Sequence, residues 1–334
     1  MAAADPDSPG PGPGAELLVL IPIYDDWASA AVLLGRLADV LGGAAISAEF
    51  LLVDDGSNTP IPADFSSGRP DVLARTEVLS LRRNLGHQRA IAVALAWVEA
   101  NRRNPMTLVM DGDGEDDPAD VPRLVAGFRE AGGTKVVFAE RRARSESRLF
   151  IFFYHLYRAA HFVLTGYGVR VGNFSVLPRA ALSKLVVVGE LWNHYAASVF
   201  RARLPWTSVP VNRATRIAGQ SKMGFVSLVV HGLSAISVYS DIVGVRVLAA
   251  TSVLIVVTVL ALAGVVGVRL LSDLAIPGWA TTAVGILLVI LSQAVTISLI
   301  FILMMLSNRQ SSTFLPIRDH AYFVAGVKRL GAAK

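Results

Sequence analysis

The stretch DGDGEDDP at residues 111–118 follows directly after the apolar run TLVM at 107–110. A short apolar run that ends in a polar turn is typical of a buried strand. Five carboxylates then occur within seven residues, and they repel one another unless a cation or a partner offsets their charge. Because side chains alternate along a strand, Asp111 and Asp113 are predicted to point to the same side.

Two interpretations of this acidic octet remain open at this point. In the first, Asp111 and Asp113 hold a divalent cation and, through it, a phosphorylated substrate, because ligand sets made of oxygen suit Mg²⁺ or Mn²⁺. In the second, the octet is a solvated turn, and Asp116 or Asp117 before Pro118 caps the helix that follows. Spacing alone does not decide between them.

Composition indicates a protein that contacts a membrane. Of the 334 residues, 53% are hydrophobic and 17% charged, with a mean hydropathy of +0.52, which favours membrane spans over an ordinary soluble domain. The net charge of +5 suits lipid headgroups, and no nucleic-acid motif is present, so no nucleic-acid partner is expected. The absence of cysteine excludes disulfides and thiolate metal sites. Residues 1–15 lack the features of a signal peptide and are expected to form a disordered tail.

Strands and helices are predicted to alternate through the first half of the chain. Such alternation predicts an α/β fold with a mostly parallel, doubly wound sheet, in which ligands bind beyond the carboxyl ends of the strands. Polar clusters at 24–26, 54–58, 82–88 and 111–117 all follow predicted strands. The predicted strands are 17–23, 49–53, 77–81, 107–110, 135–139, 174–177 and an edge strand at 206–211, and the predicted helices are 27–41, 88–100, 121–131, 148–164 and 191–200.

The C-terminal part is predicted to be membrane-bound. Residues 225–245 favour interfacial amphipathic helices, and 246–307 a hairpin of two transmembrane helices with apolar runs at 247–268 and 280–306. Basic residues flank both outer ends of the hairpin, which predicts a multi-pass inner- or plasma-membrane protein with its N-terminal α/β domain and both termini in the cytoplasm, including a tail at 308–334. Gln293, near the middle of the second span, is interpreted as a helix–helix hydrogen-bonding residue.

Four further stretches accompany the octet, in the order IPIYDD at 21–26, VDDGS at 53–57, RNLGH at 83–87 and RIAGQSK at 216–222. With the octet, they resemble the PxYNE, VDDGS, RNxGK, DxD-containing DADLQDPP and RxxGxSK motifs of inverting family-two glycosyltransferases of the GT-A fold. His87 stands where that pattern usually has lysine. The last motif and the two spans resemble the bacterial type of the dolichol-phosphate-mannose-synthase-like branch, with a GT-A domain at 16–224.

This resemblance implies a metal-dependent transfer of a sugar from a UDP- or GDP-linked donor to polyprenyl phosphate, giving a lipid-linked monosaccharide for cell-envelope glycan assembly. It implies Mg²⁺ or Mn²⁺ as the metal, and it places Asp113, Asp111 and Arg141 among the catalytic residues, with Glu190 or Asp117 as a candidate base. The implied nucleotide-sugar residues are Pro22, Tyr24, Asp26, Asp54, Asp55, Gly86, Asp111, Gly112 and Asp113; the implied metal ligands are Asp111, Asp113 and Glu115; and the implied acceptor-phosphate residues are Arg141, Arg216, Ser221 and Lys222.

Several alternatives accompany this interpretation. A processive polysaccharide synthase would carry a Gln-x-x-Arg-Trp motif and further spans, neither of which is found in the sequence. A catalytically inactive scaffold or flippase partner is disfavoured by the intact acidic and basic motifs. Arg141 suits lipid-headgroup contact as well as phosphate binding. The stretch GNFS at 172–175 departs from the Asp-Phe-Arg run of many relatives, which leaves the donor sugar open, and a homo-oligomer joined through the membrane helices is a further expectation.

Overall fold

The chain forms two compact units, which are described separately. The first comprises residues 1–155, 169–238 and 314–334, and the second comprises 156–168 and 239–313. The computed structural model describes residues 15–62, 65, 69–141, 148–168, 171–211, 214, 216–217, 225–271, 278–310 and 314–331.

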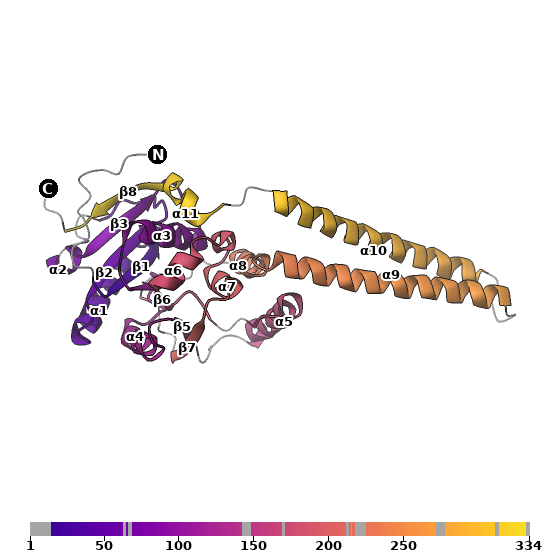
Figure 1. Cartoon of the computed structure of the whole chain (residues 1–334), viewed down its shortest axis with the longest axis horizontal. Helices are drawn as coiled ribbons and strands as arrows, with labels where there is room; N and C mark the ends of the chain where they lie inside the picture. Colours follow the sequence, from indigo (N-terminus) through magenta and orange to yellow (C-terminus); the bar gives the residue numbers. More distant parts are fainter. Residues whose placement is uncertain are drawn as a thin grey trace. The chain divides into compact units, whose positions relative to one another are not determined.

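The first unit is built on an eight-stranded mixed sheet (Figure 1). Its strand order is β7-β5-β6-β4-β1-β2-β3-β8. The pairs β1–β2, β1–β4, β2–β3 and β5–β7 are parallel, whereas β6 and β8 run antiparallel to their neighbours, so the predicted mostly parallel α/β sheet is confirmed. The strands are β1 (Leu17–Ile23), β2 (Ala48–Asp54), β3 (Thr76–Leu81), β4 (Met106–Val109), β5 (Val136–Arg141), β6 (Ser175–Pro178), β7 (Trp206–Val211) and β8 (Val324–Arg329).

Helices cover both faces of this sheet, which explains why β1 is apolar throughout. Leu17, Val19 and Ile21 face the cluster formed with α1 (Trp27–Gly43) and α4 (Val121–Glu130). Leu18 and Leu20 face the opposite cluster, to which α3 contributes its apolar side. The remaining helical elements of this unit are α2 (Pro70–Leu73), α3 (His87–Asn101), η1 (Pro118–Asp120), α6 (Arg179–Leu185), η2 (Gly189–Trp192), α7 (Tyr195–Arg201), α8 (Phe225–Ser237), α11 (Pro316–Asp319) and η3 (His320–Tyr322), whereas α5 (Arg148–Thr165) belongs partly to each unit.

The C-terminal segment belongs to this sheet. β8 pairs with β3 at the sheet edge (Figure 1). The ring centroids of Phe314 and Trp192 lie 3.9 Å apart. Phe323 packs on Trp192 as well, at a ring separation of 5.2 Å. The sequence predicts only a tail at 308–334 and not these elements, because β8 is a mostly exposed edge strand without apolar alternation.

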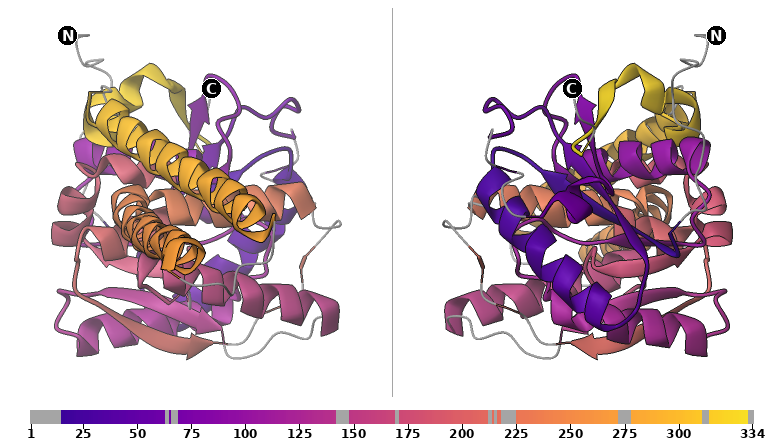
Figure 2. Two further views of the ribbon diagram at one scale, coloured as in Figure 1. Left: turned by 90° about the vertical axis from the view of Figure 1, so that its right-hand side faces the viewer. Right: turned by 90° about the vertical axis from the view of Figure 1, so that its left-hand side faces the viewer.

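The second unit contains the two longest helices of the described chain, α9 (Ser240–Leu271) and α10 (Trp279–Gln310). They run side by side (Figures 1 and 2), and Ser298 donates a hydrogen bond of 2.7 Å to the Thr251 hydroxyl. With mean hydropathies of 2.6 and 2.7, both are long and apolar enough to cross a membrane, as predicted. The Gln293 side chain is exposed on α10, and no hydrogen bond joins it to α9 among the described residues, so its helix–helix hydrogen bond stays a prediction.

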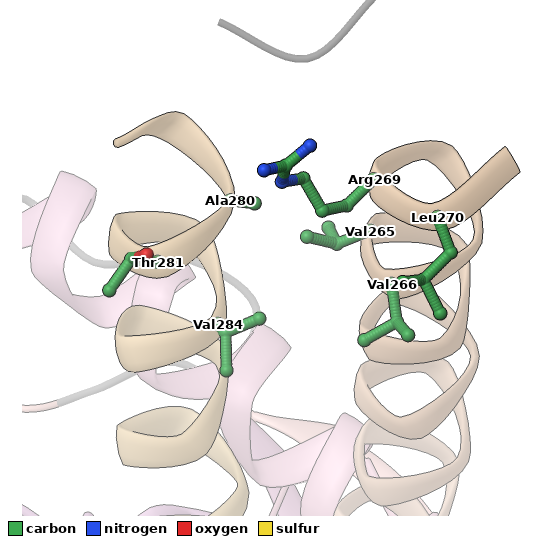
Figure 3. A pocket seen from close by; sticks show the side chains of 7 residues that line it. All are labelled: Val265, Val266, Arg269, Leu270, Ala280, Thr281 and Val284. Atoms are coloured by element: carbon green, nitrogen blue, oxygen red, sulfur yellow. The ribbon is translucent and has the colours of Figure 1, made fainter. Parts of the chain in front are cut away.

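A cavity of about 340 Å³ lies between the ends of α9 and α10 (Figure 3). Its lining is apolar apart from the guanidinium of Arg269 and the hydroxyl of Thr281. None of the predicted site residues lines it. The candidate functional site is therefore built from the ends of the strands in the first unit.

Candidate functional site

The polar segments that follow β1, β2, β3 and β4 share one edge of the sheet. These four strands are neighbours and run parallel, so their carboxyl ends lie together. This arrangement brings together the segments around Tyr24, Asp54, Gly86 and Asp111, which are separated by up to 87 positions in the chain. Pro22, on β1, pairs with Val53 and lies under this edge.

The segments after β1 and β2 are tied together by hydrogen bonds. The Ser57 amide donates to Asp54 Oδ1 at 2.9 Å, and the Ser57 hydroxyl accepts from the Asp25 amide at 3.0 Å. Asn58 donates to the Tyr24 hydroxyl at 3.1 Å. Asp26 begins α1 without making a side-chain capping bond, so its carboxylate is not used to start that helix. The residues of these two segments that are predicted to bind the nucleotide therefore lie close together, at the ends of β1 and β2.

Asp55 anchors the loop after β3. Its side chain is buried, and its two oxygens accept hydrogen bonds from the amides of Leu85 at 2.7 Å and Gly86 at 2.9 Å. Burial raises the pKa of the Asp55 carboxyl, and the two amide donors oppose that rise. Gly86 has φ +89°, a conformation that favours glycine. Asp55 thus fixes the loop that leads into α3.

Asp55→Asn is expected to destabilise the protein by about 1–3 kcal/mol, because an amide offers one acceptor oxygen to two backbone donors. The unpaired donor would be the amide of Leu85 or of Gly86. The measurement is chemical denaturation of the purified full-length protein, with Asp39→Asn on the exposed side of α1 as the matched control. Equal stability of both variants would contradict the anchoring role.

Asp113 lies at the centre of the acidic segment. Its Oδ1 accepts from the Glu115 amide at 3.0 Å, and its Oδ2 accepts from Arg216 at 2.8 Å. Its backbone carbonyl accepts from the Ile217 amide at 3.1 Å. Burial, with added repulsion from Asp111 and Glu115, raises the pKa of the Asp113 carboxyl, while Arg216 opposes the rise. Arg216 itself has a buried Nε and Nη1 for which no partner occurs among the described residues.

The two glycines of the octet allow close approaches that a side chain would block. A Cβ on Gly112 would lie 2.9 Å from the carbonyl oxygen of Pro22. A Cβ on Gly114, which has φ +80°, would lie 2.4 Å from a carbon of Ile217. The glycines therefore let the acidic segment lie between β1 and the segment that carries Arg216.

Asp111 has a different set of neighbours. Its Oδ1 lies 3.0 Å from His87 Nε2 and 3.4 Å from Asn173 Nδ2. Burial lowers the pKa of His87, but the neighbouring carboxylates, Asp111 foremost, outweigh burial and raise it. The Asp111 amide donates to Asp116 Oδ2 at 3.0 Å. Asp117 accepts from the Ala119 amide at 3.0 Å and so caps η1, which confirms the capping interpretation for this residue, while the metal interpretation of Asp111 and Asp113 stays a prediction.

The donor set of Asp111 and Asp113 suits a hard divalent cation. The described residues contain no group of three or more Asp, Glu or His side chains arranged as a complete metal site. Mg²⁺ and Mn²⁺ sites of the substrate-bridging kind use one or two carboxylates and take further oxygens from phosphate and water. In the structure the positive charge next to Asp113 is the guanidinium of Arg216, 2.8 Å from Asp113 Oδ2.

Other predicted site residues are placed less directly. Glu190 lies on η2 and forms an ion pair of 3.7 Å with Arg201, while the carbonyl of Glu115 accepts from the Ala214 amide. Arg141 ends β5, and its side chain lies outside the described part of the chain. Ser221 and Lys222 also lie outside the described residues. Their roles remain predictions.

The sequence profile described as "Glycosyl transferase family 2" matches residues 18–186, which is just over half of the chain. The chain belongs to this family. The matched region includes β1 to β6 and contains the acidic octet, Asp54, Asp55 and His87. Arg216 and the second unit lie beyond it.

Among curated relatives of this family, an undecaprenyl-phosphate 4-deoxy-4-formamido-L-arabinose transferase of Erwinia tasmaniensis is 27% identical over 219 residues, covering 63% of this chain and 64% of the relative. The protein of the same name from Salmonella choleraesuis is 25% identical over 230 residues, covering 65% of each chain. The chain thus spans slightly less than two thirds of the length of these relatives.

Solved structures with a similar arrangement are more distant. Glucosyl-3-phosphoglycerate synthase from Mycobacterium tuberculosis, in complex with Mn²⁺ and UDP-glucose, has a TM-score of 0.47 at 16% identity and covers 69% of this chain and 80% of its own. A mannosyltransferase from Pyrobaculum calidifontis, in complex with GDP-mannose and Mn²⁺, has a TM-score of 0.43 at 15% identity and covers 87% of this chain and 89% of its own.

Proposed function

We propose that this protein transfers a sugar from a nucleotide sugar to polyprenyl phosphate at a membrane surface. The observation that carries the proposal is the pairing of Asp113 with Arg216, whose two remaining buried donor atoms have no partner among the described residues. Buried donors are normally satisfied, and a phosphate oxygen is a suitable acceptor. Family membership, relatives named as undecaprenyl-phosphate sugar transferases, and two apolar helices support the same proposal.

Each group has a role in this reaction. Asp54, with Pro22, Tyr24 and Asp26, frames the nucleoside pocket at the ends of β1 and β2, and Asp55 holds the loop beside it in place. Arg216, with Ser221 and Lys222, binds the acceptor phosphate. One oxygen of that phosphate attacks the anomeric carbon and forms the new bond, while the bond from that carbon to the nucleoside diphosphate breaks. The attacking phosphate is already ionised, so a general base such as Glu190 is not needed for this step.

Asp111 and Asp113 would hold the divalent cation, Mg²⁺ or Mn²⁺, with Glu115 next to them. The bound cation would offset the charge that develops on the leaving diphosphate. The Glu115 amide, which donates to Asp113 Oδ1 at 3.0 Å, holds this carboxylate in a defined orientation for this purpose. Asn173, in the GNFS stretch at 172–175, lies next to Asp111.

We further propose that α9 and α10 cross the membrane and that the first unit faces the cytoplasm. Basic residues on the outer flanks of the hairpin, including Arg246, and few at its turn support this orientation. The substrate phosphate is then presented at the same surface as the nucleotide sugar, which is a cytosolic metabolite class.

A donor screen tests the proposed function. Full-length protein in nanodiscs is incubated with polyprenyl phosphate, Mn²⁺ or Mg²⁺ and each of a panel of radiolabelled UDP- and GDP-sugars, and the lipid extract is separated by thin-layer chromatography. A labelled lipid that requires all three components is the expected result. Failure of every donor to label lipid, with folded protein, would contradict the proposal.

We also propose that copies of the chain associate through α10. Gln293 lies within the apolar helix with its amide exposed, next to exposed Val289 and Ile297. In lipid a polar amide gains from a hydrogen bond to another helix. A second copy of the chain offers the same amide on the same surface, which makes a symmetric contact possible.

Gln293→Leu is therefore expected to shift the protein toward the monomer, by about 0.6–2 kcal/mol per contact. The measurement is the mass distribution in nanodiscs or detergent by mass photometry or sedimentation. Ser252→Leu, on the exposed side of α9, is the control for added apolar volume. An unchanged distribution for Gln293→Leu would reject this contact.

A further inference from the structure

A chain of side-chain amides connects the start of α7 with Asp111. The backbone N–H of Tyr195 donates to Gln88 Oε1 at 2.7 Å. Gln88 Nε2 donates to Asn173 Oδ1 at 3.1 Å. Asn173 Nδ2 lies 3.0 Å from His87 Nε2 and 3.4 Å from Asp111 Oδ1. Three separate segments of the first unit, around α3, β6 and α7, thus meet beside one predicted metal ligand.

The direction of the hydrogen bonds in this amide chain follows from its start at the Tyr195 backbone N–H. A backbone N–H can only donate, so Gln88 must turn its oxygen toward Tyr195 and its nitrogen toward Asn173. Asn173 must then accept through Oδ1, which leaves its NH₂ group to donate to Asp111 Oδ1, the same oxygen that lies 3.0 Å from His87 Nε2. These hydrogen bonds therefore determine which side of each amide carries the oxygen and which carries the nitrogen.

Tyr195, where the amide chain begins, is rigidly held. The Tyr195 side chain is completely buried, its hydroxyl lies 2.7 Å from that of Ser175, and its ring packs 6.4 Å from that of Phe138. Because the hydroxyl is buried, the pKa of Tyr195 is raised well above its usual range. The first turn of α7 therefore provides a fixed donor from which the amide chain begins.

We propose that Gln88 and Asn173 are positioning residues that orient the Asp111 carboxylate for the cation of the nucleotide sugar. This inference rests on the proposed function and adds to it two residues that do not ligate the cation. A carboxylate that accepts an N–H bond on one side keeps its plane and directs its remaining lone pairs outward. Loss of such supporting partners typically weakens metal binding 10–100-fold.

The proposal predicts that substitutions of Gln88 and Asn173 weaken Mn²⁺ binding even when no substrate is present. Full-length protein in nanodiscs is titrated with Mn²⁺ alone, and free Mn²⁺ is followed by electron paramagnetic resonance. Asn173→Leu, which removes the donor to Asp111 at similar volume, is expected to weaken Mn²⁺ binding about tenfold. Gln88→Met, which leaves Asn173 without its oriented partner, is expected to weaken it severalfold.

The double variant separates an amide chain from two independent structural effects. In the Asn173→Leu background, Gln88→Met is expected to change the Mn²⁺ affinity by less than twofold, because its route to Asp111 is already lost. If the two substitutions instead weaken Mn²⁺ binding by factors that multiply in the double variant, the proposal is overturned. Asn173→Ala provides a second variant at a half-buried position, should the leucine disturb folding.

Asn101→Leu is the matched control, since Asn101 lies at the other end of α3 and donates to the Trp97 carbonyl at 2.8 Å. It should leave Mn²⁺ binding unchanged, and all variants should keep the wild-type melting temperature within a few degrees. Wild-type affinity in both Gln88→Met and Asn173→Leu overturns the positioning role alone, provided that Asp111→Asn loses Mn²⁺. Absence of Mn²⁺ binding in the wild-type protein overturns this role and the metal assignment together.

Discussion

Replacing Asp113 with alanine is expected to reduce sugar transfer roughly thousandfold or more, which in most assays is complete loss. Asp113 is held at both of its oxygens, by the Glu115 amide and by the Arg216 guanidinium. Its removal takes away both the cation ligand and the partner of a buried guanidinium. The measurement is the initial rate of labelled lipid formation with the donor identified by the screen.

Two comparisons make this result specific. Asp113→Asn keeps the shape and one acceptor oxygen but not the charge, so it should remain severely impaired. Asp39→Ala removes an exposed carboxylate on α1 that pairs with Arg69, and it should transfer at the wild-type rate. Full activity of Asp113→Ala would reject the metal assignment, even if every other site residue behaves as proposed.

The parts of the fold that could be predicted are those whose signal is local. The buried strands β1, β2 and β4 appear in the sequence as apolar runs, and α9 and α10 as long charge-free segments. The polar turns after these strands then locate the site, because parallel neighbours bring their carboxyl ends together. Asp117 as a helix cap was also predictable from the proline that follows it.

The parts that could not be predicted depend on contacts between distant segments. β8 pairs with β3 across more than 240 positions, and its exposed residues lack a strand pattern. The pairs Asp113–Arg216 and Gln88–Asn173 are 103 and 85 positions apart. Gln88 directly follows the RNLGH motif, which indicates that it lies near the site. Nothing in the sequence indicates which group its amide contacts.

Arg216→Gln is the second variant with a large expected effect, and two of its properties should change in opposite directions. Transfer should fall about 10–100-fold, chiefly through a higher KM for polyprenyl phosphate, because a charged donor contributes about 1.5–3 kcal/mol to a phosphate contact. Mn²⁺ binding without substrate should instead be unchanged or tighter, since the guanidinium no longer occupies Asp113 Oδ2.

This opposition distinguishes a phosphate-binding arginine from one that merely holds the acidic segment in place. If Arg216 were only a structural partner of Asp113, its loss would loosen that carboxylate and weaken Mn²⁺ binding together with transfer. Arg123→Gln, which removes an ion pair with Asp120 on the helix after the octet, controls for the loss of an arginine–aspartate pair near this segment. Nε and Nη1 of Arg216 have no partner among the described residues, so an unchanged or tighter Mn²⁺ affinity together with a higher KM for polyprenyl phosphate would support their binding of the acceptor phosphate.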